Sequence, residues 1–464
     1  MSETASAHPY VPNSVPRIRR EMLDAIGVDG IEDLYGAIPE RLRVSGALDL
    51  PEPLRSEYEL RRHVSGLLGR NETCAETLSF LGGGCWQHYV PAVCDEVVNR
   101  GELLTAYYGD TYGDHGKLQA LFEYASMVGE LVEQDAVSLP TYDWGSAAAT
   151  AISMAARITG RRAALVPESM GPERTSLVAG YCEPWVDLVT IPFDRTTGLL
   201  DIDRISDGLS EDTACVYVEM PSYLGTIETQ AAEIASLAHD AGALCAVGVD
   251  PISLGVLEAP ARYGADIVCG ELQPLGIHMH YGGGLAGFVA SPDEERFVSE
   301  YPTFLIGLAP TSAPGEYGFG EVVWERTSYV QRGDSKEYTG TTQNLWAIAA
   351  GAYLALVGPE GIAELGRGIM KRARYAASRL GELPGVRCPV LAGPFFKEFV
   401  VDFGETGRTV AEINAALRKR GIFGGVDLST GYADLGQSAL YCVTEIHTRA
   451  DIDRLVDELG EVLR

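Results

Sequence analysis

The sequence has few positive charges and very few lysines. Among its 464 residues, 36 lysines and arginines stand against 65 aspartates and glutamates, which gives a formal net charge of −29. So acidic a chain repels nucleic acid and anionic membrane surfaces, and we expect neither as a partner. Only five lysines are present, namely Lys117, Lys336, Lys371, Lys397 and Lys419. Chemistry that needs a lysine amine therefore has few places to occur in this chain.

Long apolar runs and paired cysteines are also missing. No uninterrupted apolar run reaches the roughly 18 residues of a membrane span, and the N-terminal MSETASAHPY lacks the apolar stretch of a signal peptide. The nine cysteines include no C-x-x-C pair, and several sit in apolar, strand-like runs, as buried reduced thiols do. We therefore expect a cytoplasmic protein with no membrane segment, metal site or disulfide.

Three kinds of sequence pattern follow one another along the chain. Apolar residues recur at helical spacing in residues 10–28 and 57–70, and from about residue 140 short apolar runs alternate with helical ones. That alternation indicates a mostly parallel sheet covered on both faces. We predict an α/β fold with a helical N-terminal arm and interface region (1–135), a large α/β domain (136–355) and a small C-terminal α+β domain (356–464). This is the plan of fold type I pyridoxal-phosphate-dependent transferases, the aspartate aminotransferase-like fold.

Such enzymes need an Asp under the pyridine nitrogen and a Lys that forms a Schiff base with the cofactor. Asp250 ends the apolar run ALCAVGVD, where a carboxylate points out of the carboxyl edge of the sheet toward a ligand. The lysine is missing, because no lysine lies between Lys117 and Lys336 and the segment GADIVCGELQPLGIHMHYGGG offers no amine. A self-sufficient Schiff-base enzyme is therefore disfavoured.

The same segment resembles subunit 1 of the glycine cleavage system P-protein, with its Gln-Pro-Leu-Gly motif at residues 273–276. The motifs GGGCWQHYVPAV, LLTAYYGD, KLQALFEY, YDWGSAAA, FFKEFVVDF and YCVTEIHTRADIDRLV extend the resemblance nearly from end to end. The resemblance implies an α₂β₂-like assembly in which a lysine-bearing subunit 2 holds pyridoxal 5'-phosphate near the subunit interface. It also implies decarboxylation of glycine, with a lipoylated H-protein-like carrier as the acceptor.

Two segments are candidates for contact with a cofactor held by that partner. Thr341 and Thr342 precede a long apolar helix, where hydroxyl and backbone N–H groups suit a phosphate; a plain helix cap is the alternative. Gly283, in the Gly282–Gly284 run after Tyr281, either approaches the partner's cofactor or makes a tight turn. Residues 143–146, Asp-Trp-Gly-Ser, open a helix where an active paralogue would hold its own phosphate, and without a lysine we expect this site to be vestigial.

Further candidate residues lie in the helical N-terminal third. The resemblance implies that Tyr107, in the Thr-Ala-Tyr triplet, lines the cavity shared with subunit 2. His88 is a candidate catalytic residue, although a lone histidine is more often structural.

Two segments depart from the family pattern. The family's Thr-Pro-Tyr-Gln-Pro-Glu after the triplet is replaced by YGDTYGD at residues 108–114, and its basic run before Tyr338 is eroded to RGDSKEY. Replacement limited to these two segments suggests a changed substrate or acceptor. From the resemblance as a whole, we predict a subunit that completes the active site of a glycine decarboxylase. The alternatives are a decarboxylase subunit for another amino acid and a non-catalytic scaffold.

Overall fold

The computed structural model describes residues 10–11, 14–44, 46, 48–104, 115–303, 305–322, 335–340 and 342–464. Contacts within the chain divide it into two compact units, residues 1–72 and 73–464. The domain boundaries expected at 135/136 and 355/356 stay predictions.

The N-terminal unit is helical, as its apolar spacing predicts. Helix α1 (Pro16–Ile26) begins with a proline, whose missing N–H is not needed there, and ends at Gly27 in the left-handed region. Helix α2 (Glu57–Leu68) begins at Ser56, whose hydroxyl accepts a hydrogen bond from the Glu59 N–H. Among the described residues of this unit only Leu23 is buried. The 3₁₀ helices Ile31–Tyr35 (η2) and Glu40–Leu42 (η3) lie between the two α-helices.

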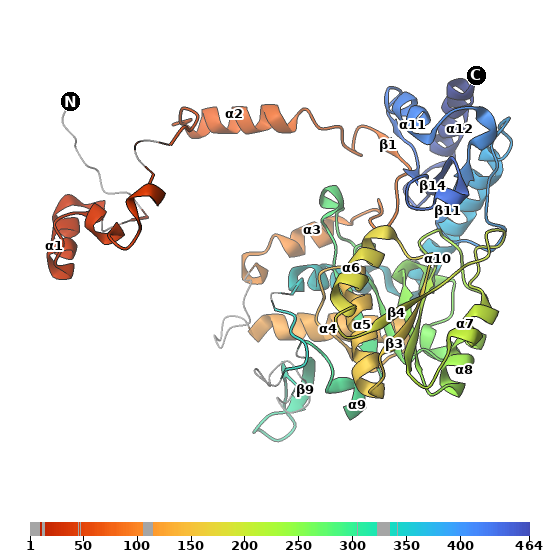
Figure 1. Ribbon diagram of the computed structural model, residues 1–464, viewed down its shortest axis with the longest axis horizontal. Helices are drawn as coiled ribbons and strands as arrows, with labels where there is room; N and C mark the ends of the chain where they lie inside the picture. Colours follow the sequence, from red (N-terminus) through yellow and green to blue (C-terminus); the bar gives the residue numbers. More distant parts are fainter. Residues whose placement is uncertain are drawn as a thin grey trace. The chain divides into compact units, whose positions relative to one another are not determined.

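A seven-stranded sheet forms the centre of the second unit (Figure 1). Its order is β2-β8-β7-β6-β5-β3-β4, and β7, β6, β5, β3 and β4 run parallel while β8 is antiparallel to both of its neighbours. Strands β5 to β8 are buried along their whole length, which confirms the prediction of a mostly parallel sheet covered on both faces. The strands are β2 (Ala136–Val137), β3 (Ala163–Pro167), β4 (Asp187–Ile191), β5 (Thr213–Met220), β6 (Leu244–Val249), β7 (Ile267–Glu271) and β8 (Gly287–Ser291).

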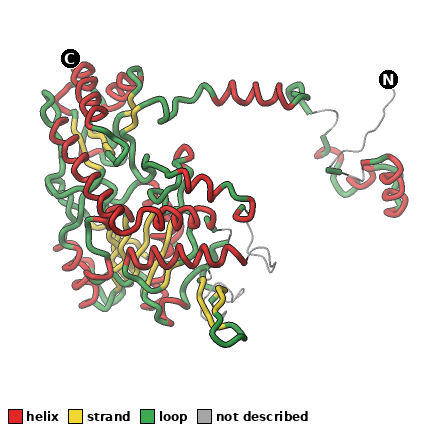
Figure 2. The backbone as a smooth tube through the Cα atoms, turned by 180° about the vertical axis from the view of Figure 1, so that it is seen from behind, coloured by secondary structure: helices red, strands yellow, loops and turns green. Residues whose placement is uncertain are grey.

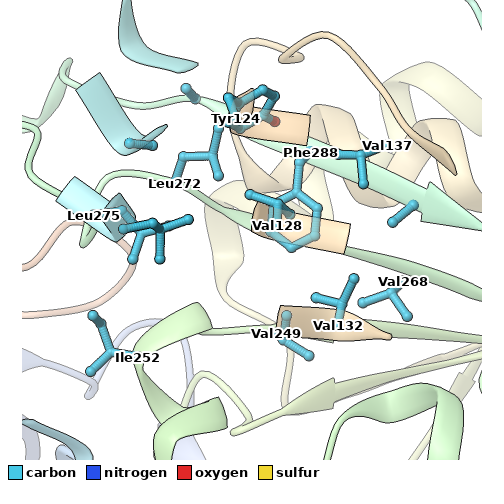
Figure 3. Close-up of a cluster of buried hydrophobic side chains, with 14 of the residues drawn as sticks. Tyr124, Val128, Val132, Val137, Val249, Ile252, Val268, Leu272, Leu275 and Phe288 are labelled. Carbon is cyan, nitrogen blue, oxygen red and sulfur yellow. The ribbon is translucent and has the colours of Figure 1, made fainter. Parts of the chain in front are cut away.

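Helices lie on both faces of this sheet (Figure 2). On one face, α4 packs Tyr124, Val128 and Val132 against Val268 and Phe288 of β7 and β8 (Figure 3). The Ala-rich helix α5 packs on the other face. The covering helices are α4 (His115–Val132), α5 (Trp144–Thr159), α6 (Pro172–Cys182), α7 (Ile202–Gly208), α8 (Ala231–Asp240) and α9 (Glu295–Val298).

The C-terminal elements build a smaller α+β layer, coloured blue in Figure 1. Its antiparallel sheet has the order β11-β14-β13, with β11 (Glu398–Asp402), β13 (Val426–Asp427) and β14 (Ser438–Cys442), and α11 (Val410–Arg418) and α12 (Arg449–Leu463) pack beside it. Strand β1 (Leu78–Ser79) pairs with β12 (Ile422–Phe423), so a segment from early in the chain reaches this layer. The other elements are α3 (Ala92–Val98), the hairpin β9 (Ile306–Pro310) and β10 (Tyr317–Glu321), and the 3₁₀ helices Gly101–Leu103 (η4), Pro251–Gly255 (η6), Pro260–Tyr263 (η7), His280–Gly282 (η8), Gly404–Thr406 (η11) and Ala433–Leu435 (η12).

Helix α10 (Asn344–Leu380) runs from the large sheet toward the C-terminal layer. By length and composition it could cross a membrane, since an 18-residue window has a mean hydropathy of 1.4, but 44% of that window is buried inside the protein. Gly358, at φ 63°, and Pro359 interrupt its helical path. It packs against α3, α4 and η6, as a core helix does.

Candidate active site

The predicted cofactor carboxylate is already paired within the chain. Asp250 follows β6 at the carboxyl edge of the sheet and is 2% exposed. Its Oδ2 lies 2.7 Å from Nζ of Lys397, which comes directly before β11 and is 2% exposed. A lysine ammonium therefore stands where a fold type I enzyme places the cofactor's ring nitrogen.

Aromatic and charged side chains fill the space around this ion pair. Lys397 Nζ sits 3.6 Å from the ring centroid of Trp86, a cation–π contact. The Arg174 guanidinium lies 4.3 Å from the ring of Trp144 and forms an ion pair with the buried Glu219. The cavity left between these side chains measures about 10 Å³, whereas ligand pockets span roughly 300–1,000 Å³.

Two carboxyl side chains also occupy the N-terminus of α5, the position expected for a phosphate. The Trp144 N–H donates to Oε2 of Glu271 at 3.0 Å, and the Ser146 N–H donates to Oδ1 of Asp143 at 2.6 Å. Glu271 Oε1 accepts two more backbone N–H bonds, from Gln273 and Ala286. Burial raises the pKa of Glu271 to about 8, against the three N–H donors, which favour the carboxylate.

These residues do not fit a cofactor of this chain's own. The ring-nitrogen carboxylate is neutralised by Lys397, the helix N-terminus is occupied by Asp143 and Glu271, and the cleft is filled. A hollow of about 280 Å³ lies beside the cleft, and its lining includes the carboxyl residues Asp143, Glu173 and Glu271. Arg174 also lines this hollow, but its guanidinium is already paired with the buried Glu219, so it is not free to bind a phosphate there. The Asp-Trp-Gly-Ser helix start, expected to be vestigial as a phosphate site, is held by the protein's own side chains.

His88 is a buried member of the same network. Its Nε2 lies 3.1 Å from Lys397 Nζ, and its Nδ1 lies 2.8 Å from Oε2 of Glu445. Since an ammonium can only donate, Nε2 accepts and Nδ1 carries the proton that is donated to Glu445. Burial would raise the pKa of Glu445, but the hydrogen bonds from the His88 Nδ1–H and the Tyr89 N–H outweigh burial and hold this pKa below its usual value. With both ring nitrogens engaged inside the protein, His88 is placed to orient its segment.

The structure brings His88, Gly283 and Thr342 into one region of the second unit. His278 Nε2 lies 2.9 Å from Asp95 Oδ1 of α3, the helix that follows His88. The His280 ring stacks on Trp346 in the first turn of α10, at 5.3 Å between centroids, just after Thr342. Contacts among α3, the 276–284 loop and the start of α10 thus link the three predicted positions. Tyr107 and Thr341 lie outside the described residues.

The local geometry shows what Thr342 bonds to and which glycines the turn around Gly283 requires. The Thr342 hydroxyl donates to Oδ1 of Asn344 at 2.7 Å, and Gln343, not Thr342, is the N-cap residue of α10. In the glycine run, Gly282 has φ +94° and a Cβ on Gly284 would lie 2.0 Å from the His278 carbonyl oxygen, whereas Gly283 has ordinary space. The turn therefore needs glycine at Gly282 and Gly284. Tyr281 has φ 57° and is 83% exposed, a strained conformation that presents a large aromatic ring to solvent.

Sequence reasoning missed Lys397, Glu271 and Glu445. A signal for Lys397 was present, because a chain with only five lysines places one of them within the apolar run FFKEFVVDF. Burial of a lysine in such a strand implies a carboxylate partner. The partner's identity depends on tertiary contacts.

Known proteins of one family are similar to this chain along nearly its whole length. A model of the family described as the glycine cleavage system P-protein matches residues 9–459. The "probable glycine dehydrogenase (decarboxylating) subunit 1" of Staphylothermus marinus is 38% identical over 467 residues, which cover 98% of each chain. The protein of the same description from Aeropyrum pernix is 38% identical over 470 residues, covering 98% of this chain and 99% of that one.

Solved structures give the same result. The crystal structure of glycine decarboxylase (P-protein) of the glycine cleavage system, in inhibitor-bound form, matches with a TM-score of 0.84 and 34% identity, covering 96% of this chain and 98% of that one. A sphingosine-1-phosphate lyase from Burkholderia pseudomallei matches with a TM-score of 0.63 at 17% identity over 92% of this chain and 94% of that one, a likeness of fold alone. The predicted fold type I is thereby confirmed. The chain belongs to the glycine cleavage system P-protein family.

Proposed function

We propose that this chain is the lysine-less subunit of a two-subunit, pyridoxal-phosphate-dependent glycine decarboxylase. The observation that carries the proposal is the closed cleft. Lys397 forms an ion pair with Asp250, the carboxylate that a cofactor would need, and the segment around Gln273 contains no lysine. A chain of this family with no usable cofactor site of its own needs a lysine-bearing partner. That partner's cofactor supplies the electron sink that decarboxylation requires.

The region around the 276–284 loop supports contact with the partner's site. We propose that Thr341 and Thr342 contact the phosphate of the partner's cofactor, that Gly283 approaches that cofactor, and that Tyr107 lines the shared cavity. Two exposed aromatic residues support an interface here, Tyr89 at 64% and Tyr281 at 83% exposure, because exposed tyrosines are typical of interface anchors. His88, buried between Lys397 and Glu445, orients this region.

Glycine is the proposed substrate, and a lipoylated H-protein-like carrier is the proposed acceptor of the aminomethyl group. The description of the relatives as glycine dehydrogenase (decarboxylating) subunits supports glycine as the substrate. The match to the glycine cleavage system P-protein family is what suggests a carrier of this kind. A cytoplasmic location is proposed, because none of the nine cysteines forms a disulfide, as is typical of a reducing compartment.

The test is exchange of labelled bicarbonate into glycine by this chain co-expressed with its lysine-bearing homologue. We expect exchange only with both chains present, stimulated by the lipoyl carrier. Exchange with a different amino acid would overturn the substrate assignment. Equal activity of the lysine-bearing chain alone would leave this chain a scaffold.

A further inference from the structure

Residues 82–89, which contribute Trp86 to the filled cleft, are held by side chains from distant parts of the chain. Backbone groups of this segment form hydrogen bonds with side chains from three separate parts of the chain. The Gly83 N–H donates to Glu398 Oε1 at 2.6 Å, beside Lys397 at the start of β11. After β14, Thr444 donates to the Gln87 carbonyl at 2.7 Å and Glu445 accepts from the Tyr89 N–H at 2.6 Å.

The third part of the chain that bonds to residues 82–89 is the segment around Gln273, which lacks the lysine. Oε1 of Gln273 accepts from the Trp86 N–H at 3.0 Å, and its Nε2 donates to the Trp86 carbonyl at 2.9 Å. Gln273 is fully buried, and it also donates to the Ile277 carbonyl at 2.9 Å. One amide side chain thus ties the 82–89 segment to the start of the 276–284 loop.

Lys397 lies at the centre of these contacts. Its ammonium contacts the Asp250 carboxylate, the His88 ring nitrogen and the face of Trp86. Two of these three groups belong to the 82–89 segment, and the third is the carboxylate that a cofactor would use. We propose that the former cofactor cleft has become a clamp, with Lys397 as the positioning residue that fixes the 82–89 segment for the partner subunit.

The clamp has a route to the proposed interface. The 82–89 segment leads through Tyr89 into α3, whose Asp95 holds His278 of the loop that carries Tyr281. The thiol of Cys85 donates to the Met279 carbonyl at 3.8 Å, a second link from the segment to that loop. A shift of the segment by about 1 Å would displace groups at the interface, and a displacement of that size can cost about a hundredfold in rate.

The inference rests on the proposed function, because its readout is turnover of the two-subunit complex. The variants are Lys397→Met, which removes the ammonium, and Lys397→Met with Asp250→Asn, which removes both charges of the buried pair. Lys371→Met is the matched control, since Lys371 is exposed on α10. Each chain is purified in complex with the lysine-bearing subunit, and thermal stability, kcat and KM for glycine are measured.

We expect the double variant to recover most of the stability lost by Lys397→Met, because no unpaired charge stays buried. Its kcat should nevertheless stay about tenfold or more below that of the wild type, because His88 and Trp86 are no longer held. Recovery of kcat together with stability would overturn the positioning role. If the wild-type complex shows no decarboxylation, the proposed function itself is refuted. If the wild type is active and the double variant is stable and equally active, only the clamp is refuted.

Discussion

Replacement of Lys397 by methionine should destabilise the protein strongly. The variant keeps the length of the side chain but leaves the Asp250 carboxylate, 2% exposed, without its cation. Removal of one partner from a buried ion pair costs about 3–5 kcal/mol. A loss of about 4 kcal/mol raises the unfolded fraction roughly a thousandfold. Unfolding in urea, followed by tryptophan fluorescence, measures this loss.

The double variant Lys397→Met with Asp250→Asn decides whether the ion pair is the cause. With both charges removed, we expect a loss of about 1–2 kcal/mol, far less than the sum of the two single variants. Additive losses would show that the two side chains act independently. A Lys397→Met variant as stable as the Lys371→Met control would refute the buried pair altogether.

Three further predictions concern other side chains of the site. Burial raises the pKa of Glu271 from 4.5 to about 8. The unfolded chain therefore loses this proton at a lower pH than the folded chain does. As pH rises from about 4.5 to 8, the group lowers the free energy of unfolding by up to about 1.4 kcal/mol per pH unit. Melting temperatures across pH 5–9 should therefore fall more steeply for wild type than for Glu271→Gln, and parallel curves would contradict this. Tyr281→Gly removes a side chain from a left-handed backbone position and should leave stability unchanged or raise it by up to about 1 kcal/mol while lowering turnover of the complex; a loss of stability with full turnover would contradict it. Thr342→Val should lower turnover about tenfold without a change in melting temperature if its hydroxyl contacts the partner's cofactor, and wild-type kinetics would remove Thr342 from the site.

The fold could be predicted because its elements carry strong local patterns. The alternation of short apolar runs with helical ones became a mostly parallel sheet, and the run ALCAVGVD contains β6, which is buried along its whole length. Residues 143–146 were predicted to open a helix, and α5 begins at Trp144, with Asp143 as its N-cap residue. The position of Asp250 at a strand end, and the missing lysine after it, also followed from the sequence alone.

The contents of the cleft could not be predicted in the same way. Lys397 lies 147 positions after Asp250 in the sequence (397 − 250), and their pairing depends on how the C-terminal layer packs against the sheet. Glu271 lies two residues before the Gln-Pro-Leu-Gly motif, and its hydrogen bond to the N-terminus of α5 depends on the packing of α5 against β7. Long-range ion pairs and side-chain bonds to backbone N–H groups leave no periodic signal in a sequence.

The measurement that tests the account most directly is cofactor stoichiometry in the purified two-subunit complex, combined with the exchange assay. Cofactor is quantified by its absorbance after release in alkali, for the complex and for each chain alone. The account predicts one cofactor for each pair of chains, none on this chain alone, and glycine–bicarbonate exchange only when both chains are present. Saturable binding of cofactor to this chain alone, or exchange activity without its partner, would contradict the closed cleft formed by Lys397, Asp250 and Glu271.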